Sequence, residues 1–342
     1  MTALYLFPGS FSPPTRGHLH LVKKALKFLP RVTIVCSINA DKPNDWFAEE
    51  ESMDLWQSYD LPENVNVTIL DEIKETVKNA KDVVMIRGIR DNDDAEHEKQ
   101  VMIQNSRNYG IEQFFYIYSD SNYKNVSSSR VRRLAENLEL EELSKLVSPM
   151  VVTKLLEKVL EINNLFLVVG QPGSGKSTFL RELARLNKNN LFINTDDFNK
   201  KLKNLIEVEF SGQDIVEMAL KREEELIEKI KEPWMNFLKE ELKQVPAGSN
   251  VFVEIPYGMQ KEKSMFRFVG GKVLCIGCSK EILKKRVKGR GTPELLPFID
   301  RIPDISETRN IVKENKLDLI VVHSECSKKR FLEKAEEFNQ TL

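Results

Sequence analysis

Short apolar runs alternate with amphipathic segments along the first 150 residues of this 342-residue chain. The apolar runs predict five strands, over residues 3–7, 32–37, 66–70, 83–86 and 114–118. The segments between them show helical spacing, over residues 17–29, 48–58, 71–79, 93–108 and 128–136. Because strands that alternate with helices form parallel sheets covered on both faces, the pattern predicts a three-layer α/β domain. Ligands of such sheets bind beyond the carboxyl ends of the strands.

The same alternation starts again in the second half of the chain. Residues 137–163 have helical spacing, and Pro149 predicts a break between two helices. Further strands are expected over residues 165–169, 191–194, 251–255, 272–276 and 317–322, with a helix over 177–186. Residues 199–244 form a long charged helical region, in which Pro233 and Trp234 predict a break. The pattern therefore predicts a second α/β domain with a helical insertion.

Composition narrows the classes of partner. Lys and Arg number 51 against 52 Asp and Glu, so the net charge of -1 gives no basic footprint for nucleic acid. No apolar run approaches the ~20 residues of a membrane span, and no basic region precedes the first strand as in a signal peptide. Four cysteines suit a reducing compartment, so we expect a cytoplasmic protein. The sequence leaves open a homo-oligomer formed through the N-terminal domain.

Two of the cysteines have the spacing of a redox or zinc motif. Cys275 and Cys278 lie at the end of a buried-strand pattern, with no second Cys or His pair nearby. We expect ordinary buried thiols here, with a zinc or redox site as the alternative.

The turn after the first strand has the composition of a phosphate site. Gly9 lets the backbone approach a ligand, and Gly17 and His18 stand at a predicted helix start, where unpaired N–H groups favour anions. His18 and a hydroxyl of Ser10 or Thr15 can donate hydrogen bonds to phosphoryl oxygens. The spacing Thr15-x-Gly17-His18 resembles the (H/T)xGH motif of the nucleotidylyltransferase superfamily. The alternative is a capping turn with a structural histidine.

Two later stretches supply partners for this turn. Arg87 and Arg90 follow the strand over residues 83–86, and two arginines at a strand end can clamp phosphates. Ser127, Ser128 and Ser129 begin a predicted helix, where their hydroxyls, the helix end and the basic residues Arg130 and Arg132 can hold a triphosphate.

Together these stretches resemble bacterial phosphopantetheine adenylyltransferase over roughly residues 3–150. The resemblance rests on RGxR at Arg87–Arg90, the D-x-E-x-E that follows, Asn105, and SSS-x-V from Ser127. The resemblance implies transfer of an adenylyl group from ATP to 4′-phosphopantetheine, giving dephospho-coenzyme A and pyrophosphate. It implies an ATP site made of Gly9, Ser10, Phe11, Gly17, His18, Arg90, Glu98, Ser127, Ser128 and Ser129. It implies a phosphopantetheine site made of Ser10, Thr15, Lys42 and Arg87, with His18, Lys42 and Arg90 as the catalytic set.

Three positions depart from that family. Ser10 replaces the usual threonine and keeps its hydroxyl, Ser12 replaces the usual aspartate, and His97 replaces an aromatic residue. The rival within the superfamily is an adenylyltransferase for nicotinamide mononucleotide, which prefers His at the Thr15 position and lacks the block that begins at Arg87.

A second phosphate loop opens the second half. Residues 170–177 fit GxxxxGK[ST] between a predicted strand and a predicted helix. Backbone N–H groups of such a loop cradle the phosphates, Lys176 would reach the β- and γ-phosphates, and Ser177 would bind Mg²⁺. The predicted nucleotide site comprises Gly170, Gly173, Ser174, Gly175, Lys176, Ser177 and Thr178.

The remaining chemistry of this half points to a small kinase. Asp196 or Asp197 would accept the proton of a substrate hydroxyl, and Glu254 could orient Mg²⁺ through water. Arg286 and Arg290 have the helical spacing of a lid that closes on phosphates. These features resemble dephospho-coenzyme A kinase in outline over residues 165–335. General polynucleotide or nucleoside kinases, and zeta-toxin-like kinases, remain open.

We therefore expect a Rossmann-like nucleotidylyltransferase domain over residues 1–150, a helical connector over 151–163 and a P-loop kinase domain over 164–342. The predicted function is a bifunctional enzyme of coenzyme A synthesis that uses ATP and Mg²⁺ and ends with phosphorylation of dephospho-coenzyme A. The alternatives are nicotinamide mononucleotide adenylyltransferase joined to a nucleoside kinase, and a single enzyme with its P-loop domain as a regulatory switch.

Overall fold

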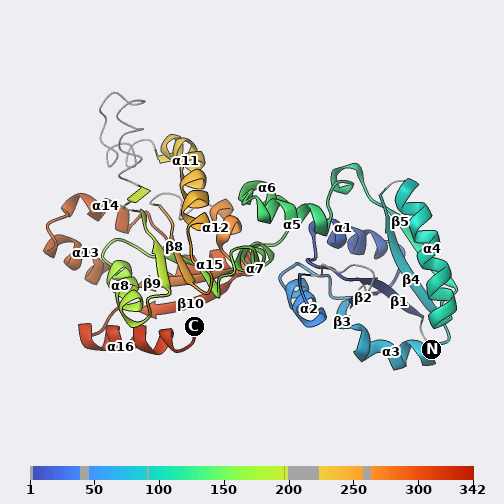
Figure 1. Cartoon of the computed structure of the whole chain (residues 1–342). Coiled ribbons are helices and arrows are strands. Elements are labelled where there is room, and N and C mark those ends of the chain that lie inside the picture. Colours follow the sequence, from blue (N-terminus) through green and yellow to red (C-terminus); the bar gives the residue numbers. More distant parts are fainter. Residues whose placement is uncertain (1–2, 39–45, 91, 196, 199–222, 257–262) are drawn as a thin grey trace. The chain divides into compact units, whose positions relative to one another are not determined.

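The computed structural model describes residues 3–38, 46–90, 92–195, 197–198, 223–256 and 263–342. The chain divides into two compact units (Figure 1). The first comprises Met1–Asn137 with Glu142–Val151, and the second comprises Leu138–Glu141 with Val152–Leu342. The functional boundaries at 150 and 163 stay a prediction.

The N-terminal unit is built on a five-stranded parallel sheet. Its strands are β1 (Leu4–Gly9), β2 (Val32–Cys36), β3 (Val65–Ile69), β4 (Val83–Ile89) and β5 (Gln113–Tyr118). The order is β3-β2-β1-β4-β5, so the chain fills one side of β1 and then the other. The switch point between β1 and β4 is where open α/β sheets bind ligands.

Helices connect these strands. They are α1 (Arg16–Ala25), α2 (Glu49–Gln57), α3 (Leu70–Asn79), α4 (Asn92–Tyr109), the 3₁₀ turn η1 (Ser121–Tyr123) and α5 (Ser128–Glu136). The buried side of α1 carries Leu19, Val22 and Ala25 at helical spacing. Trp56 of α2 and Ile34 of β2 are fully buried, so the sheet and its helices share a packed core.

Strand β4 is longer than the sequence predicts. It runs to Ile89, so Arg87 and Gly88 lie within the ladder and pair with Tyr116 and Ile117 of β5. The apolar pattern stops at Ile86 because Arg87 is polar, but pairing with β5 continues past it. Arg87 is therefore held by a strand rather than by a loop.

Two helices follow, and the second of them begins at Pro149. They are α6 (Leu140–Leu146) and α7 (Pro149–Val159), as the sequence predicts. Proline suits the first turn of a helix because its missing N–H has no intrahelical partner there. Thr153 of α7 accepts a hydrogen bond from Gly271 N at 2.8 Å, and both residues belong to the second unit.

The C-terminal unit has a second five-stranded parallel sheet, in the order β10-β9-β6-β8-β7. Its strands are β6 (Asn164–Val169), β7 (Asn190–Ile193), β8 (Asn250–Glu254), β9 (Lys272–Gly277) and β10 (Asp318–His323). Its helices are α8 (Lys176–Leu186), α11 (Glu223–Lys243), α12 (Lys263–Val269), α13 (Lys280–Gly289), α14 (Leu296–Ile299), α15 (Ile305–Glu314) and α16 (Lys328–Asn339), with the 3₁₀ turn η3 (Pro293–Leu295). The predicted fold class, two three-layer α/β domains, is confirmed.

The break expected at Pro233 is wrong. Helix α11 continues through Pro233. Trp234 is 1% exposed and packs edge-on against Phe198, with 5.1 Å between ring centroids. Burial of a tryptophan outweighs one lost helical hydrogen bond, so packing overrides the local preference. No described helix is long and apolar enough to cross a membrane.

Candidate active sites

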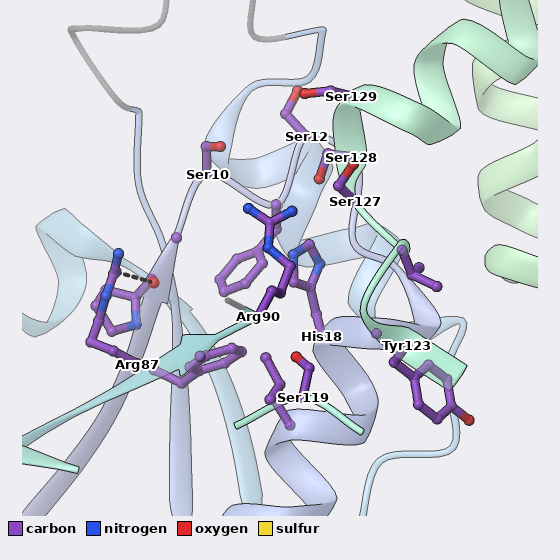
Figure 2. Close-up of a pocket in the computed structure, with 18 of the residues that line it drawn as sticks. Ser10, Ser12, His18, Arg87, Arg90, Ser119, Tyr123, Ser127, Ser128 and Ser129 are labelled. Atoms are coloured by element: carbon purple, nitrogen blue, oxygen red, sulfur yellow. Dashed lines mark hydrogen bonds between the residues drawn. The ribbon is translucent and has the colours of Figure 1, made fainter. Parts of the chain in front are cut away.

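A cavity of about 540 Å³ lies at the carboxyl ends of β1, β4 and β5 (Figure 2). It brings together most residues predicted for the first site. Gly9, Ser10, Phe11, Gly17, His18, Arg87, Arg90, Glu98, Ser127, Ser128 and Ser129 line it. Lys42 lies outside the described residues. Arg132, one of the basic residues that the sequence places after the serine run, also lines the cavity, and so do Ser119 and Tyr123, to which the sequence did not point.

His18 is fixed by the cap of helix α1. Thr15 is the N-cap residue, and its Oγ1 accepts from His18 N at 3.3 Å. In return, His18 Nδ1 accepts the backbone N–H of Thr15 at 3.1 Å. A neutral imidazole with an accepting Nδ1 carries its hydrogen on Nε2, so this capping box also sets the tautomer.

Thr15 itself is a positioning residue in this geometry. The residue is fully buried, and its hydroxyl lies 3.2 Å from His18 Nδ1. The resemblance implies that Thr15 holds substrate, whereas its contacts orient His18. The ring of Phe11 packs edge-on against His18 with centroids 5.2 Å apart, and Trp56 packs on Phe11 in the same way.

Arg87 and Glu98 form a bidentate ion pair. Arg87 Nε and Nη2 donate to the two carboxylate oxygens of Glu98 at 2.5 and 2.7 Å, and Nη1 donates to Pro8 O at 3.2 Å. The Glu98 side chain is only 9% exposed. Both of its oxygens are engaged, so Glu98 is better described as orienting Arg87 than as holding ATP directly.

Arg90 and the serine run form the opposite wall. Ser127 caps α5 by accepting Arg130 N at 3.2 Å, and Ser128 Oγ donates to Pro13 O at 2.9 Å. The positive end of α5 therefore faces the cavity beside Arg90 (Figure 2). A cationic side chain and a helix start together favour an anionic ligand.

Ser12, which replaces the family's aspartate, has a structural task. Its hydroxyl accepts from Trp46 N at 2.8 Å and Phe47 N at 3.0 Å, and Ser12 is 1% exposed. The residue thus joins the turn after β1 to the segment before α2. A buried hydroxyl bonded twice to backbone is satisfied without a ligand.

Tyr123, which lines the first cavity, is held by residues that the sequence did not single out. Tyr123 stacks on His20 with ring centroids 4.3 Å apart, and His20 Nε2 lies 2.9 Å from Asp120 Oδ2. Lys24 Nζ donates to Asp120 Oδ1 at 2.6 Å and to Tyr118 O at 2.8 Å. The hydrogen bond from Lys24 lowers the pKa of Asp120 below its ordinary value. Helix α1 therefore holds η1 in place.

The second cavity, of about 330 Å³, surrounds the loop between β6 and α8. Its lining includes Gly173, Ser174, Gly175, Lys176, Ser177, Thr178, Arg181 and Arg290. Gly170 has φ 148°, and a Cβ there would lie 2.2 Å from Ile276 O. Only glycine fits that position, and the loop can pass close to β9 for this reason. The GxxxxGKS motif therefore has the strand–loop–helix context that phosphate binding needs.

Lys176 lies against the loop it belongs to. Its Nζ donates to Gly170 O at 2.7 Å and lies 3.4 Å from Glu254 Oε1, at the end of β8. Glu254 Oε2 accepts from Thr195 Oγ1 at 3.2 Å. The donor set of the Ser177 hydroxyl and the Glu254 carboxylate consists of hard oxygens, which fits Mg²⁺. Among the described residues no cluster of three His, Cys, Asp or Glu side chains forms a separate metal site.

Arg286 and Arg290, predicted together as a lid, lie in different places. Arg286 Nη1 donates to Gly173 O at 3.3 Å and to Ser324 Oγ at 3.0 Å, and Nη2 donates to Ser324 O at 2.7 Å. These bonds make Arg286 a support behind the phosphate loop, while Arg290 lines the cavity. Gln171, which the sequence did not single out, is 3% exposed and donates to the carbonyl of Ile299.

Only one of the two candidate bases of the second site belongs to the described part of the chain. Asp196 lies outside the described residues. Asp197 is exposed, and its Oδ2 accepts from Asn194 Nδ2 at 3.0 Å while its N–H donates to Asn194 Oδ1. A base role for either residue stays a prediction.

Cys275 and Cys278 are buried free thiols, as expected. Burial raises the pKa of the Cys275 thiol to about 11. A buried thiol with a raised pKa is a poor nucleophile, which agrees with a structural role.

Comparison with known proteins divides the chain in the same way. A model described as cytidylyltransferase-like matches residues 6–134, and a model described as an AAA domain matches residues 167–307. A phosphopantetheine adenylyltransferase of Rhodopirellula baltica is 32% identical over 161 residues, which are 46% of this chain and 89% of that protein. The protein of the same name from Aquifex aeolicus is 32% identical over 158 residues, 45% of this chain and 94% of its own. A solved structure of NadR protein in complex with NAD and AMP-PNP covers 99% of this chain and 96% of its own, at 14% identity and a TM-score of 0.34, a likeness too low to support an inference.

Proposed function

This chain belongs, through its N-terminal half, to the phosphopantetheine adenylyltransferase family, and from that premise we propose that its first site adenylylates 4′-phosphopantetheine. The chain is a nucleotidyltransferase joined to a P-loop phosphotransferase. We propose further that the second site phosphorylates the 3′-hydroxyl of the dephospho-coenzyme A made by the first. The observation that carries the first proposal is the cavity in which His18, Arg87, Arg90 and the start of α5 meet.

The first reaction forms one bond and breaks one bond. A phosphate oxygen of 4′-phosphopantetheine attacks the α-phosphorus of ATP, and the bond from that phosphorus to the bridging oxygen breaks. Pyrophosphate leaves with the electron pair. Negative charge grows on the phosphoryl oxygens, so the protein contributes positioning and hydrogen-bond donors rather than a covalent intermediate.

The described side chains suit those tasks. His18, with its hydrogen on Nε2, donates to an α-phosphoryl oxygen. Arg87, oriented by Glu98, binds the phosphate of phosphopantetheine, and Arg90 with the N-terminus of α5 binds the polyphosphate of ATP. The resemblance to the family implies that Lys42 takes part in the same reaction.

The second reaction uses the loop of residues 170–177. Its backbone and Lys176 bind the phosphates of a second ATP, which requires Lys176 to exchange Gly170 O for phosphate oxygens. Ser177 and, through water, Glu254 would hold Mg²⁺, which neutralises charge on the β- and γ-phosphates. Arg290 stabilises charge on the transferred group, and Asp196 or Asp197 accepts the proton of the acceptor hydroxyl.

Product analysis by mass tests both steps. The full chain receives ATP and Mg²⁺ with either 4′-phosphopantetheine or nicotinamide mononucleotide. We expect dephospho-coenzyme A from the first mixture, followed by a gain of one phosphate. His18→Ala should abolish the first product and leave phosphorylation of added dephospho-coenzyme A intact, and Lys176→Ala should do the reverse.

Two outcomes would overturn these assignments separately. A dinucleotide from nicotinamide mononucleotide, without dephospho-coenzyme A, would refute the first acceptor. Dephospho-coenzyme A that gains no phosphate would refute the second acceptor. ATP turnover that needs no acceptor at all would indicate a switch instead of a kinase.

A further inference from the structure

The phosphate loop of the second site is joined to helix α14 by one buried side chain, that of Gln171, which is 3% exposed. Its Nε2 donates at 2.5 Å to the carbonyl of Ile299, the last residue of α14, and at 3.1 Å to the carbonyl of Ile302. Carbonyls at the end of a helix have no partner within that helix. Both hydrogens of the Gln171 amide are therefore used to hold the end of α14.

Gln171 does not itself face the ligand. The cavity of about 330 Å³ is lined by its loop neighbours Gly173 and Ser174, whereas Gln171 is not among the described residues that line it. The side chain extends from the loop towards α14 instead. Any effect of Gln171 on phosphate transfer must therefore act through the helix that it holds.

Helix α14 packs against α13, the helix that ends beside the cavity. Ile299 is fully buried in a cluster with Leu283 and Val287 of α13. Arg290 is the C-cap residue of α13, three positions after Val287, and it lines the cavity. The contacts of Gln171 therefore reach Arg290 through the side chain of Ile299.

The loop also contacts α13 directly. A Cβ on Gly173 would lie 3.2 Å from Val287 Cγ2 and 3.3 Å from Leu283 O, and Arg286 Nη1 donates to Gly173 O. The loop, α13 and α14 thus contact one another in all three pairs. Because buried contacts are close-packed, a shift of α14 would displace the end of α13 as well.

We propose that Gln171 is a positioning residue for phosphate transfer at the second site. Its two hydrogen bonds hold α14, and through α14 they hold the end of α13, so that Arg290 faces the terminal phosphate of ATP. Without the amide donor, two carbonyls near the end of α14 lose their bonds to the loop, which favours displacement of the helix. This inference rests on the proposed phosphate transfer, but it does not depend on which acceptor receives the phosphate.

Calorimetric titration of the full chain tests this role without an acceptor. The probes are ADP and AMP-PNP, a non-hydrolysable analogue of ATP, each with Mg²⁺. Only AMP-PNP has the third phosphoryl group, so the ratio of the two affinities reports contacts to the terminal phosphate. All proteins carry His18→Ala and Arg90→Ala to weaken the first site, and the same background with Lys176→Ala gives the residual signal to subtract.

Gln171→Met is the test variant, because methionine has a similar length and no hydrogen-bond donor. Asp300→Asn is the matched control, because it weakens a different link between α13 and α14. Asp300 Oδ1 lies 3.5 Å from Lys280 Nζ and Oδ2 lies 3.3 Å from Lys284 Nζ. These side chains are about half exposed, and exposed ion pairs contribute little.

We expect Gln171→Met to weaken AMP-PNP binding about fivefold and ADP binding less than twofold, with no change in the control. Arg290→Ala should show the same pattern. Adding Gln171→Met to Arg290→Ala should cause no further loss, because the two residues act in one chain of contacts. An equal loss of ADP affinity, or losses that multiply in the double variant, would overturn the positioning role.

Hydrogen exchange shows whether the substitution acts at the end of α14. The N–H groups of Arg301 and Ile302 donate to Phe298 O at 3.2 and 3.0 Å. Gln171→Met should speed the exchange of these two amides about tenfold and leave the amides of β6 unchanged. Faster exchange throughout β6 would mean that Gln171 supports the whole unit, and would contradict a local role.

Failure of this inference and failure of the proposed function give different results. A chain that does not phosphorylate dephospho-coenzyme A, but whose Gln171→Met variant loses its preference for AMP-PNP, has another acceptor and the same positioning residue. A chain that phosphorylates dephospho-coenzyme A with an unaltered preference in that variant has the proposed function without it. With the acceptor present, Gln171→Met should lower kcat about tenfold and leave the KM for the acceptor within twofold.

Discussion

Substitution of Glu98 tests whether this buried carboxylate orients Arg87 or holds ATP. Glu98 accepts two charge-assisted hydrogen bonds from Arg87, and its side chain is 9% exposed. Removing one partner of a buried pair costs about 3–5 kcal/mol. The Arg87 side chain keeps 21% exposure and can regain water, so we expect a smaller loss, about 2–3 kcal/mol for Glu98→Ala.

The loss should be local and measurable. Hydrogen exchange of the β4 amides in the full chain reports the stability of this region, and Glu98→Ala should raise their exchange rates by about 30- to 150-fold. Glu75→Gln, which removes an exposed carboxylate paired with Lys78, is the control and should leave those rates unchanged.

Kinetics decide which ligand Glu98 serves. If Glu98 orients Arg87, Glu98→Gln should raise the KM for 4′-phosphopantetheine about tenfold and leave the KM for ATP within twofold. A coupled assay of pyrophosphate release measures both constants. A raised KM for ATP with an unchanged KM for phosphopantetheine would refute this reasoning and place Glu98 on the nucleotide.

Three further predictions concern other parts of the chain. His20→Ala should raise the KM for ATP about fivefold with little change in kcat, because Tyr123 loses its stacking partner, and His20→Phe should restore it. Gly170→Ala should abolish binding of a fluorescent ATP analogue to the second site, because a Cβ there meets a β9 carbonyl at 2.2 Å, whereas Gly248→Ala, with positive φ but open space, should not. Since burial raises the pKa of Cys275 from 9.0 to about 11, the unfolded chain loses that proton first. Its contribution to stability is present below pH 9 and is lost towards pH 11, so Cys275→Ala should flatten the fall in urea midpoint over that window.

The elements and their types follow from local patterns. The apolar runs of β1, β2, β5, β6 and β9 are short and bounded by polar turns, so they read as strands before any tertiary contact is known. Misjudged positions are those where packing opposes the local signal. Arg87 continues a strand because β5 pairs with it, and Pro233 sits inside a helix because Trp234 is buried.

The candidate site residues also fall into two groups, those that a local pattern identifies and those that depend on distant contacts. Residues 170–177 can be identified as a phosphate loop from their spacing alone, because a phosphate loop is a local structure. Arg286 has the spacing of a lid arginine, but its partners Gly173 and Ser324 lie 113 and 38 positions away. No local sequence pattern predicts contacts between residues so far apart in the chain.

The sequence by itself determined two α/β units, a helix start at His18 and a P-loop at Gly170, because strand and helix periods and capping turns depend on neighbouring residues. Only the tertiary structure decided which side chains meet. It joined Lys24 to Asp120 across 96 positions and bonded both oxygens of Glu98 to Arg87. Those pairings depend on the order of strands in the sheet. Hydrogen bonds form only at donor–acceptor distances of about 3 Å, so another strand order would not bring these side chains together.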